Sequence, residues 1–113
     1  MSGSLADLFD EDKFEAELIK QKIKQRRKQM LIHSCIYYEL NDNVVSDHKW
    51  QEWAEELAKL QNDHPDCCKI HYYDDAFKDW DGTTGAMLPY REAGIFANAR
   101  WLLNFHKEKV QNS

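Results

Sequence analysis

The sequence predicts a mostly α-helical domain. A long N-terminal helix and a second helix over residues 47–62 form a hairpin, and a C-terminal helix packs across it. Three observations predict this fold. No Gly or Pro occurs from about residue 10 to residue 40, residues 47–62 lie between a helix-start and a helix-stop signal, and helical periodicity returns over residues 94–109. The chain has 113 residues, which is the size of one domain.

The first predicted helix runs from about residue 10 to residue 40 and is rich in strong helix formers. Its apolar side chains recur near the helical period at Phe14, Leu18, Ile19, Ile23, Met30, Leu31, Cys35 and Tyr38. We expect residues 1–9 to be disordered, so that the folded domain comprises residues 10–113. A helix of this length cannot bury all its apolar positions within so small a domain. We therefore expect Phe14, Leu18 and Ile19 to face a second chain, in a homo-oligomer built through this half of the helix.

A polar turn separates the first helix from the second. Asn41, Asp42 and Asn43 are turn-forming residues, and Ser46 is a good N-cap for a helix that begins at Asp47. The second helix carries an apolar stripe made of Trp50, Trp53, Ala54, Leu57, Ala58 and Leu60. It ends before Pro65, because the residue that precedes a proline is biased away from helical backbone angles.

The remainder of the chain divides into an irregular segment and a final helix. Residues 66–92 fit neither a regular helix nor a strand, and Gly82–Gly85 is a loop by composition. From about residue 94 to residue 109 the apolar spacing is helical again. We expect this helix to pack across the hairpin through Trp101 and Leu102.

Charge and composition exclude several classes of protein. The net charge of -5 argues against a dedicated nucleic-acid binder, which would normally be basic. The basic run over residues 20–28 is predicted to be a solvated helix face that pairs with the acidic segment before it. No apolar run approaches the roughly 20 residues of a membrane helix, and the N-terminus does not read as a signal peptide. An odd number of cysteines fits a reducing cytosol, so we expect a cytoplasmic protein.

Two clusters invite a metal-site interpretation, and the spacing favours neither. The acidic cluster consists of Asp74, Asp75, Asp79 and Asp81. Its spacing does not fit a calcium-binding EF-hand loop, which favours a solvated acidic loop. Cys67, Cys68 and His71 lack a fourth ligand at zinc-like spacing. The sequence therefore predicts no metal site.

The stretch from Tyr37 to Asp66 carries a family resemblance. Its characteristic residues occur in the order Tyr37-Tyr38, Ser46-Asp47, Trp50-Gln51, Glu56-Leu57, Leu60 and His64-Pro65-Asp66. This order resembles the N-terminal domain Ia of bacterial NAD-dependent DNA ligases. Two positions depart from the family, because Trp50 stands where the family has Tyr and Gln51 stands where it has Asp.

The resemblance implies a ligand site. In that family the matching residues stack on and hydrogen-bond the nicotinamide mononucleotide half of NAD. The resemblance therefore assigns a nicotinamide-type nucleotide to a site made of Tyr37, Tyr38, Asp47, Trp50 and Gln51. Trp50 offers a stacking surface with an indole donor, and Gln51 offers hydrogen bonds without a charge. Considered without the resemblance, the tyrosine pair is more typical of buried aromatics at a helix end than of a ligand site, and the resemblance reverses this interpretation.

The chain lacks the parts that make a ligase catalytic. A ligase takes AMP on the lysine of a Lys-x-Asp-Gly motif within a nucleotidyltransferase domain. Residues 78–82 read Lys-Asp-Trp-Asp-Gly, which has one residue too many, and the chain is too short for that domain. We therefore expect no ligase activity, no required cofactor and no catalytic residues.

Two functions of different classes follow. The first is a free-standing, non-catalytic module of the domain Ia type, of the kind that phages and prophages encode, which binds NAD or a nicotinamide mononucleotide-like ligand. The alternative is an interaction protein that uses the hairpin as a scaffold to bind a protein partner, such as a host factor, without a small molecule. A third idea, sequestration of an NAD-derived signalling nucleotide, needs cations near Tyr37, for which Lys49 and Arg91 are the candidates.

Overall fold

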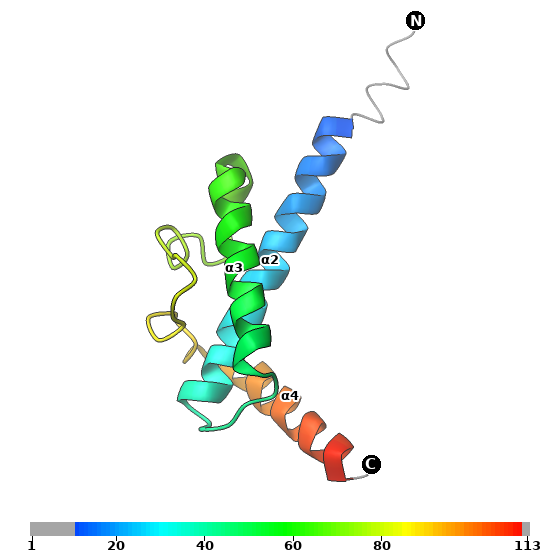
Figure 1. Ribbon diagram of the computed structural model, residues 1–113, viewed down its shortest axis with the longest axis vertical. Coiled ribbons are helices and arrows are strands. Elements are labelled where there is room, and N and C mark those ends of the chain that lie inside the picture. The colour runs from blue at the N-terminus through cyan, green and yellow to red at the C-terminus, as the bar shows by residue number, and fades with distance from the viewer. Residues whose placement is uncertain (1–10, 112–113) are drawn as a thin grey trace, which may run out of the picture.

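The computed structural model describes residues 11–111 and is built from helices (Figure 1). The elements are α2 (Glu11–Tyr38), α3 (Asp47–Asp63), the short 3-10 helix η1 (Pro65–Cys68) and α4 (Ala93–Gln111). No strand occurs in this described range. The prediction of a mostly α-helical fold with a hairpin and a crossing C-terminal helix is confirmed. The disorder predicted for residues 1–9 concerns residues outside the described range.

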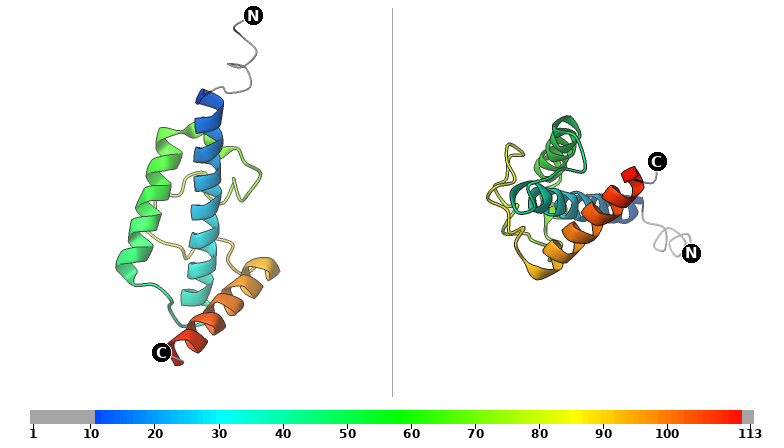
Figure 2. Two further views of the ribbon diagram at one scale, coloured as in Figure 1. Left: turned by 90° about the vertical axis from the view of Figure 1, so that its right-hand side faces the viewer. Right: turned by 90° about the horizontal axis from the view of Figure 1, so that it is seen from below.

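Helices α2 and α3 lie antiparallel, and α4 crosses the C-terminal end of α2 (Figure 2). The turn between α2 and α3 begins where Asn41 adopts a left-handed backbone with φ 51°. Asparagine tolerates this conformation better than most residues do. Helix α3 starts at its predicted cap, since the Ser46 hydroxyl accepts from the backbone N–H of Lys49 at 3.1 Å. It ends at Asp63, next to the predicted stop at Pro65.

The core lies where the three helices meet the irregular segment over residues 69–92. Its buried apolar side chains come from all of these parts and include Ile23, Met30, Leu31, Ile36, Ala54, Leu57, Phe77, Leu88, Tyr90, Ile95, Ala99 and Leu103. The amphipathic stripe of each helix therefore points inward, as the periodicity predicts. Viewed from below, residues 69–92 run beside α2 from the end of α3 to the start of α4 (Figure 2).

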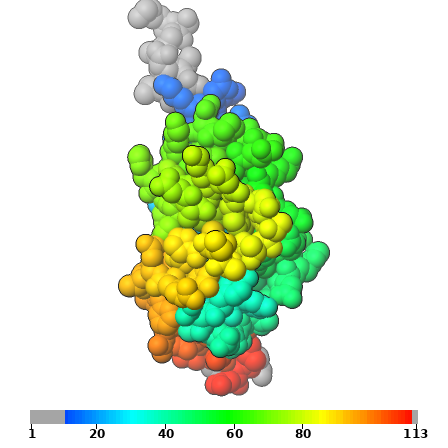
Figure 3. Space-filling view, turned by 90° about the vertical axis from the view of Figure 1, so that its left-hand side faces the viewer, coloured from blue at the N-terminus to red at the C-terminus, as the bar shows by residue number. Residues whose placement is uncertain are grey.

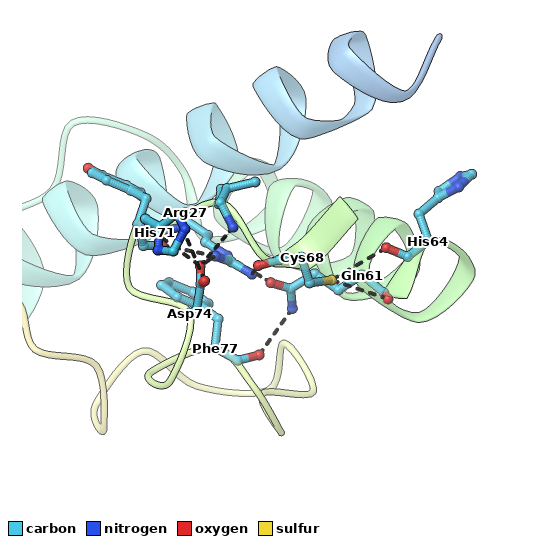
Figure 4. A network of polar contacts seen from close by, with 9 residues as sticks. Arg27, Gln61, His64, Cys68, His71, Asp74 and Phe77 are labelled. Atoms are coloured by element: carbon cyan, nitrogen blue, oxygen red, sulfur yellow. Dashed lines mark hydrogen bonds and ion pairs between the residues drawn. The ribbon is translucent and has the colours of Figure 1, made fainter. Parts of the chain in front are cut away.

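Arg27 holds the irregular segment against α2 (Figure 4). Its side chain is 1% exposed. Its guanidinium donates to the backbone oxygens of Cys68 and Tyr72 and to the side chains of Gln61 and Asp74, at 2.7–3.1 Å. The prediction that residues 20–28 form a solvated face is therefore wrong at Arg27. A buried guanidinium is tolerated because its donors are paired.

Other members of the basic run also differ from the expectation. Lys22 and Arg26 pair with Glu56 of α3, at 3.6 and 3.0 Å. Lys20 does pair within the acidic segment, with Glu17 at 3.4 Å. Because Glu56 belongs to α3, these two ion pairs connect the helices of the hairpin and help to fix the position of α3 along α2.

The five apolar residues for which an interface was predicted differ in burial. Phe14 and Leu18 are 66% and 48% exposed, as expected for residues beyond the reach of the core. Ile19 is half-buried and packs against the core, and its contact with a second chain stays a prediction. Trp101 is 66% exposed and stacks on Phe105, so it does not fix α4 to the hairpin, whereas Leu102 packs against the core.

Within residues 11–111 no helix is long and apolar enough to cross a bilayer.

Candidate functional site

One pocket is lined by all five residues that the family resemblance assigns to a ligand, which are Tyr37, Tyr38, Asp47, Trp50 and Gln51. It lies between the end of α2, the start of α3 and the loop over residues 83–85, and its volume is about 260 Å³. Its lining residues are His33, Ser34, Tyr37, Tyr38, Asn43, Val44, Val45, Asp47, Trp50, Gln51, Thr83, Thr84 and Gly85. In the space-filling view, the yellow segment that includes the loop adjoins the cyan end of α2 (Figure 3).

The aromatic residues of the pocket are held in different ways. Tyr38 stacks on Tyr90, with ring centroids 5.5 Å apart and planes inclined by 15°. Its hydroxyl lies 3.2 Å from Oγ1 of Thr84, so this ring is fixed on two sides. Tyr37 meets Tyr38 edge-on and is 55% exposed, which leaves ring surface open. Trp50 makes an edge contact with Trp80. Tyr37 and Trp50 therefore offer the pocket its surfaces for a flat ring.

The polar rim comes from the first turns of α3. Asp47 is the first residue of the helix, and Gln51 follows one turn later. The Gln51 amide donates to Glu55 at 3.4 Å, so Gln51 lies on an exposed ridge with a carboxylate behind it. Among the described residues, Asp47 is the only acidic or basic side chain, histidine aside, that lines the pocket. The rim therefore supplies one negative charge.

The two cations considered for phosphate binding lie outside the pocket lining. Lys49 pairs with Glu52, with Nζ 3.3 Å from Oε2. Arg91 pairs with Glu39. Because each cation has a carboxylate partner of its own, the geometry does not favour a site that grips several phosphates.

The floor of the pocket is formed by His33 and Ser34, which were not predicted from the sequence. Both lie four positions before the tyrosine pair, and residues four apart share a helix face. This four-residue spacing is the feature of the sequence from which both residues could have been predicted to line the same site as the tyrosine pair. Ser34 is 1% exposed, and among the described residues its Oγ and the Nδ1 of His33 have no hydrogen-bond partner. Burial lowers the pKa of His33 to about 4, so its imidazole is neutral at pH 7.

The loop over residues 83–85 closes the pocket against α2. Trp80 holds it by donating from Nε1 to the Thr84 carbonyl at 2.7 Å. Gly85 packs directly over the floor, since a Cβ at this position would lie 2.0 Å from Ser34 Oγ and 3.2 Å from Trp50. Only glycine lets the loop approach this closely. The sequence marked this segment as a loop without indicating that it forms a wall of the site.

The other clusters have structural roles. Asp74 accepts hydrogen bonds from Arg27 and from backbone amides of residues 70–72, and Asp81 accepts from Thr83. The expectation of a purely solvated acidic loop is therefore wrong at Asp74. Within residues 11–111, no three His, Cys, Asp or Glu side chains lie close enough together to hold a metal ion.

Comparison with known proteins supports a ligase-like region. A stretch of 48 residues is 38% identical to a DNA ligase from Bacteroides fragilis. This stretch makes up 42% of the chain and 7% of that ligase, so the chain matches only a small part of the larger protein. No family model matches the chain, and no solved structure matches it. The chain thus contains a region similar to a short part of a DNA ligase.

Proposed function

We propose that this protein is a non-catalytic, domain Ia-like module that binds a nicotinamide-type nucleotide in the pocket between α2 and α3. One observation carries the proposal. Tyr37, Tyr38, Asp47, Trp50 and Gln51 were chosen from a sequence pattern, and they line one pocket in the structure. Residues that served only as packing would fill one another's space instead of surrounding a cavity of about 260 Å³.

Each group has a role that suits such a ligand. The open faces of Tyr37 and Trp50 stack on the nicotinamide ring, which is flat and positively charged. Asp47 accepts from the ribose hydroxyls and attracts the ring's charge. With Tyr38 fixed by Tyr90 and Thr84, this ring keeps its position without ligand, which lowers the ordering cost of binding.

The proposed module holds the nucleotide without transferring it. Residues 78–82 lack the adenylation spacing, and Lys78 lies outside the pocket lining. After incubation with NAD or ATP, intact-mass spectrometry should find no covalent AMP on the protein. A mass increase equal to AMP would assign a catalytic role.

Calorimetric titration tests the binding proposal. NAD and nicotinamide mononucleotide should bind, while ADP-ribose, which lacks the nicotinamide ring, should bind more weakly. Asp47→Ala should weaken both nicotinamide ligands, because the ribose hydroxyls lose their acceptor. Asp63→Ala is the matched control, since it removes a carboxylate from the opposite end of α3, where Asp63 pairs with Lys59 on the surface. Absence of binding at millimolar concentration would refute the proposal.

A protein-binding role is the second candidate, and the exposed end of α2 favours it. Phe14 and Leu18 project from the N-terminal half of α2 with 66% and 48% of their surface open. An apolar pair four residues apart on an exposed helix is typical of helix–helix association. This role would replace the nucleotide proposal if the titrations fail.

A further inference from the structure

The floor of the pocket holds two buried polar atoms without partners. Ser34 Oγ and His33 Nδ1 are closed to water and form no hydrogen bond with any described residue. Buried hydroxyls and ring nitrogens are almost always paired in folded proteins. Both residues line the same pocket, so a ligand that enters it is the natural partner for both atoms.

The chemistry of the floor selects a neutral group. A serine hydroxyl donates or accepts, and a neutral imidazole presents one donor and one acceptor nitrogen. His33 is neutral because burial lowers its pKa to about 4. Among the described residues, Asp47 is the only Asp, Glu, Lys or Arg of the lining, and its carboxylate repels an anion. The group that fits has both a donor and an acceptor and carries no charge.

We propose that Ser34 and His33 form a subsite for a primary carboxamide on the ring of the ligand. The Ser34 hydroxyl donates to the carboxamide oxygen, and His33 Nδ1 accepts from its N–H. This inference rests on the proposed function and extends it, because it makes the pocket select the amide form of a pyridine nucleotide over the acid form. Gly85 lies directly over Ser34 Oγ, which a Cβ at this position would approach to 2.0 Å, so the carboxamide takes the place that Gly85 occupies in the free protein.

A Cβ at Gly85 would lie 3.2 Å from Trp50 Cζ2 as well as 2.0 Å from Ser34 Oγ, so Gly85 and Trp50 cover the floor together. The loop over residues 83–85 has to move away from Ser34 when the carboxamide binds, since Ser34 Oγ is closed to water. The carboxylate of a nicotinic acid nucleotide would lose its hydration there and meet the field of Asp47. The same site therefore binds the amide and discriminates against the acid.

The test compares two ligands that differ only in this group. Nicotinamide mononucleotide and nicotinic acid mononucleotide are titrated calorimetrically into the full chain. Wild-type protein should bind the amide about tenfold more tightly, the worth of roughly one well-made hydrogen bond. Ser34→Ala should bring the two affinities to within about threefold of each other. Its midpoint of thermal unfolding should not fall, because the hydroxyl it removes has no partner in the free protein.

Two further variants complete the test. His33→Phe keeps an aromatic ring beside Trp53, which the imidazole contacts at a centroid distance of 5.3 Å, and should also reduce the preference for the amide. Cys35→Ala truncates the neighbouring buried residue, which is outside the pocket lining, and should leave the ratio of affinities unchanged.

The outcomes separate this inference from the proposed function. Equal binding of amide and acid by wild-type protein would overturn the carboxamide subsite and leave nucleotide binding standing. An equal loss of both affinities in Ser34→Ala would overturn the subsite as well. Failure of wild-type protein to bind either ligand would overturn both proposals.

Discussion

Arg27 and Asp74 join the hairpin to the irregular segment, with Nη1 of the guanidinium 2.7 Å from Oδ1 of the carboxylate. Burial raises the pKa of Asp74, but the hydrogen bonds from Arg27 and from amides of residues 70–72 outweigh it and hold the pKa below its ordinary value. The segment anchored here continues into the loop over residues 83–85. The Arg27–Asp74 ion pair thus helps to position the loop over residues 83–85, which forms a wall of the pocket although it lies further along the chain than Asp74.

Replacing Arg27 should destabilise the whole domain. Arg27→Leu removes the ion pair of Asp74 and leaves the carbonyls of Cys68 and Tyr72 without their side-chain donor, so the free energy of unfolding should fall by about 3–5 kcal/mol. Urea denaturation followed by circular dichroism measures this change. Lys28→Leu is the control, because Lys28 is exposed on the same helix, and it should change the free energy of unfolding by less than about 0.5 kcal/mol. Equal effects of the two substitutions would show that Arg27 does not anchor the segment.

His33 should make stability depend on pH. Its folded pKa of about 4 lies below the ordinary value of 6.5, so the unfolded chain binds the proton more readily between these values. Stability is therefore complete above pH 6.5 and should fall as the pH drops toward 4, by up to about 1.4 kcal/mol per pH unit. The pKa of Asp74 is also lowered, so its contribution to the free energy of unfolding is lost at a still lower pH, when its carboxylate becomes protonated.

The pH effect is isolated by substitution. His33→Gln should flatten the pH dependence of the free energy of unfolding between pH 6.5 and pH 4, measured by urea denaturation at several pH values. His48→Gln replaces an imidazole that is 86% exposed and should leave the slope as it is in the wild type. A slope that survives in His33→Gln would contradict the burial of a neutral imidazole.

The sequence was sufficient for the helices because their signals are local. Ser46 as a cap, Pro65 as a stop and the uninterrupted run before Tyr38 act within a few residues of where they stand. The role of Arg27 depends on partners more than thirty positions away, so a basic run looked like a solvated face. Trp101 shows the opposite error, since large apolar residues are often exposed and its size alone did not predict burial.

The site was predicted only in part for a similar reason. Asp47, Trp50 and the tyrosine pair belong to one contiguous motif, so a family pattern locates them. The loop over residues 83–85 lies far along the chain and carries no motif. Its proximity to Ser34 follows from the way residues 69–92 fold back onto α2, which is tertiary information.

Truncating a stacking ring should weaken nucleotide binding. Trp50→Ala removes an aromatic wall, and by analogy with bases stacked on aromatic side chains the loss should be about 1–3 kcal/mol, or roughly five- to 150-fold in affinity. Trp101→Ala removes a tryptophan that is 66% exposed on α4, outside the pocket lining, and should leave the affinity unchanged. Titration of nicotinamide mononucleotide into both variants measures the difference. Equal affinities would exclude Trp50 from ligand binding.

The exposed end of α2 should mediate self-association. We expect at least a dimer at tens of micromolar by light scattering, because Phe14 and Leu18 present an apolar face that residues 11–111 leave exposed. Leu18→Glu should shift the mass toward the monomer. Val110→Glu, which places the same charge at another exposed apolar position, should not. A monomeric mass for wild-type protein would rule out this interface.

The most direct test of the proposed nucleotide site places at residue 51 the carboxylate that stands at the matching position of the ligase domain Ia, which residues 37–66 resemble. Gln51 lies on the pocket rim beside Asp47, so Gln51→Asp places a second carboxylate near the expected position of the nicotinamide ring. Calorimetric titration of wild-type and Gln51→Asp protein should show tighter binding of nicotinamide mononucleotide by the variant, because its ring is positively charged. The affinity for ADP-ribose, which has no such ring, should stay nearly the same. If neither protein binds either ligand at millimolar concentration, or if the substitution changes both affinities equally, the pocket is not a nicotinamide site.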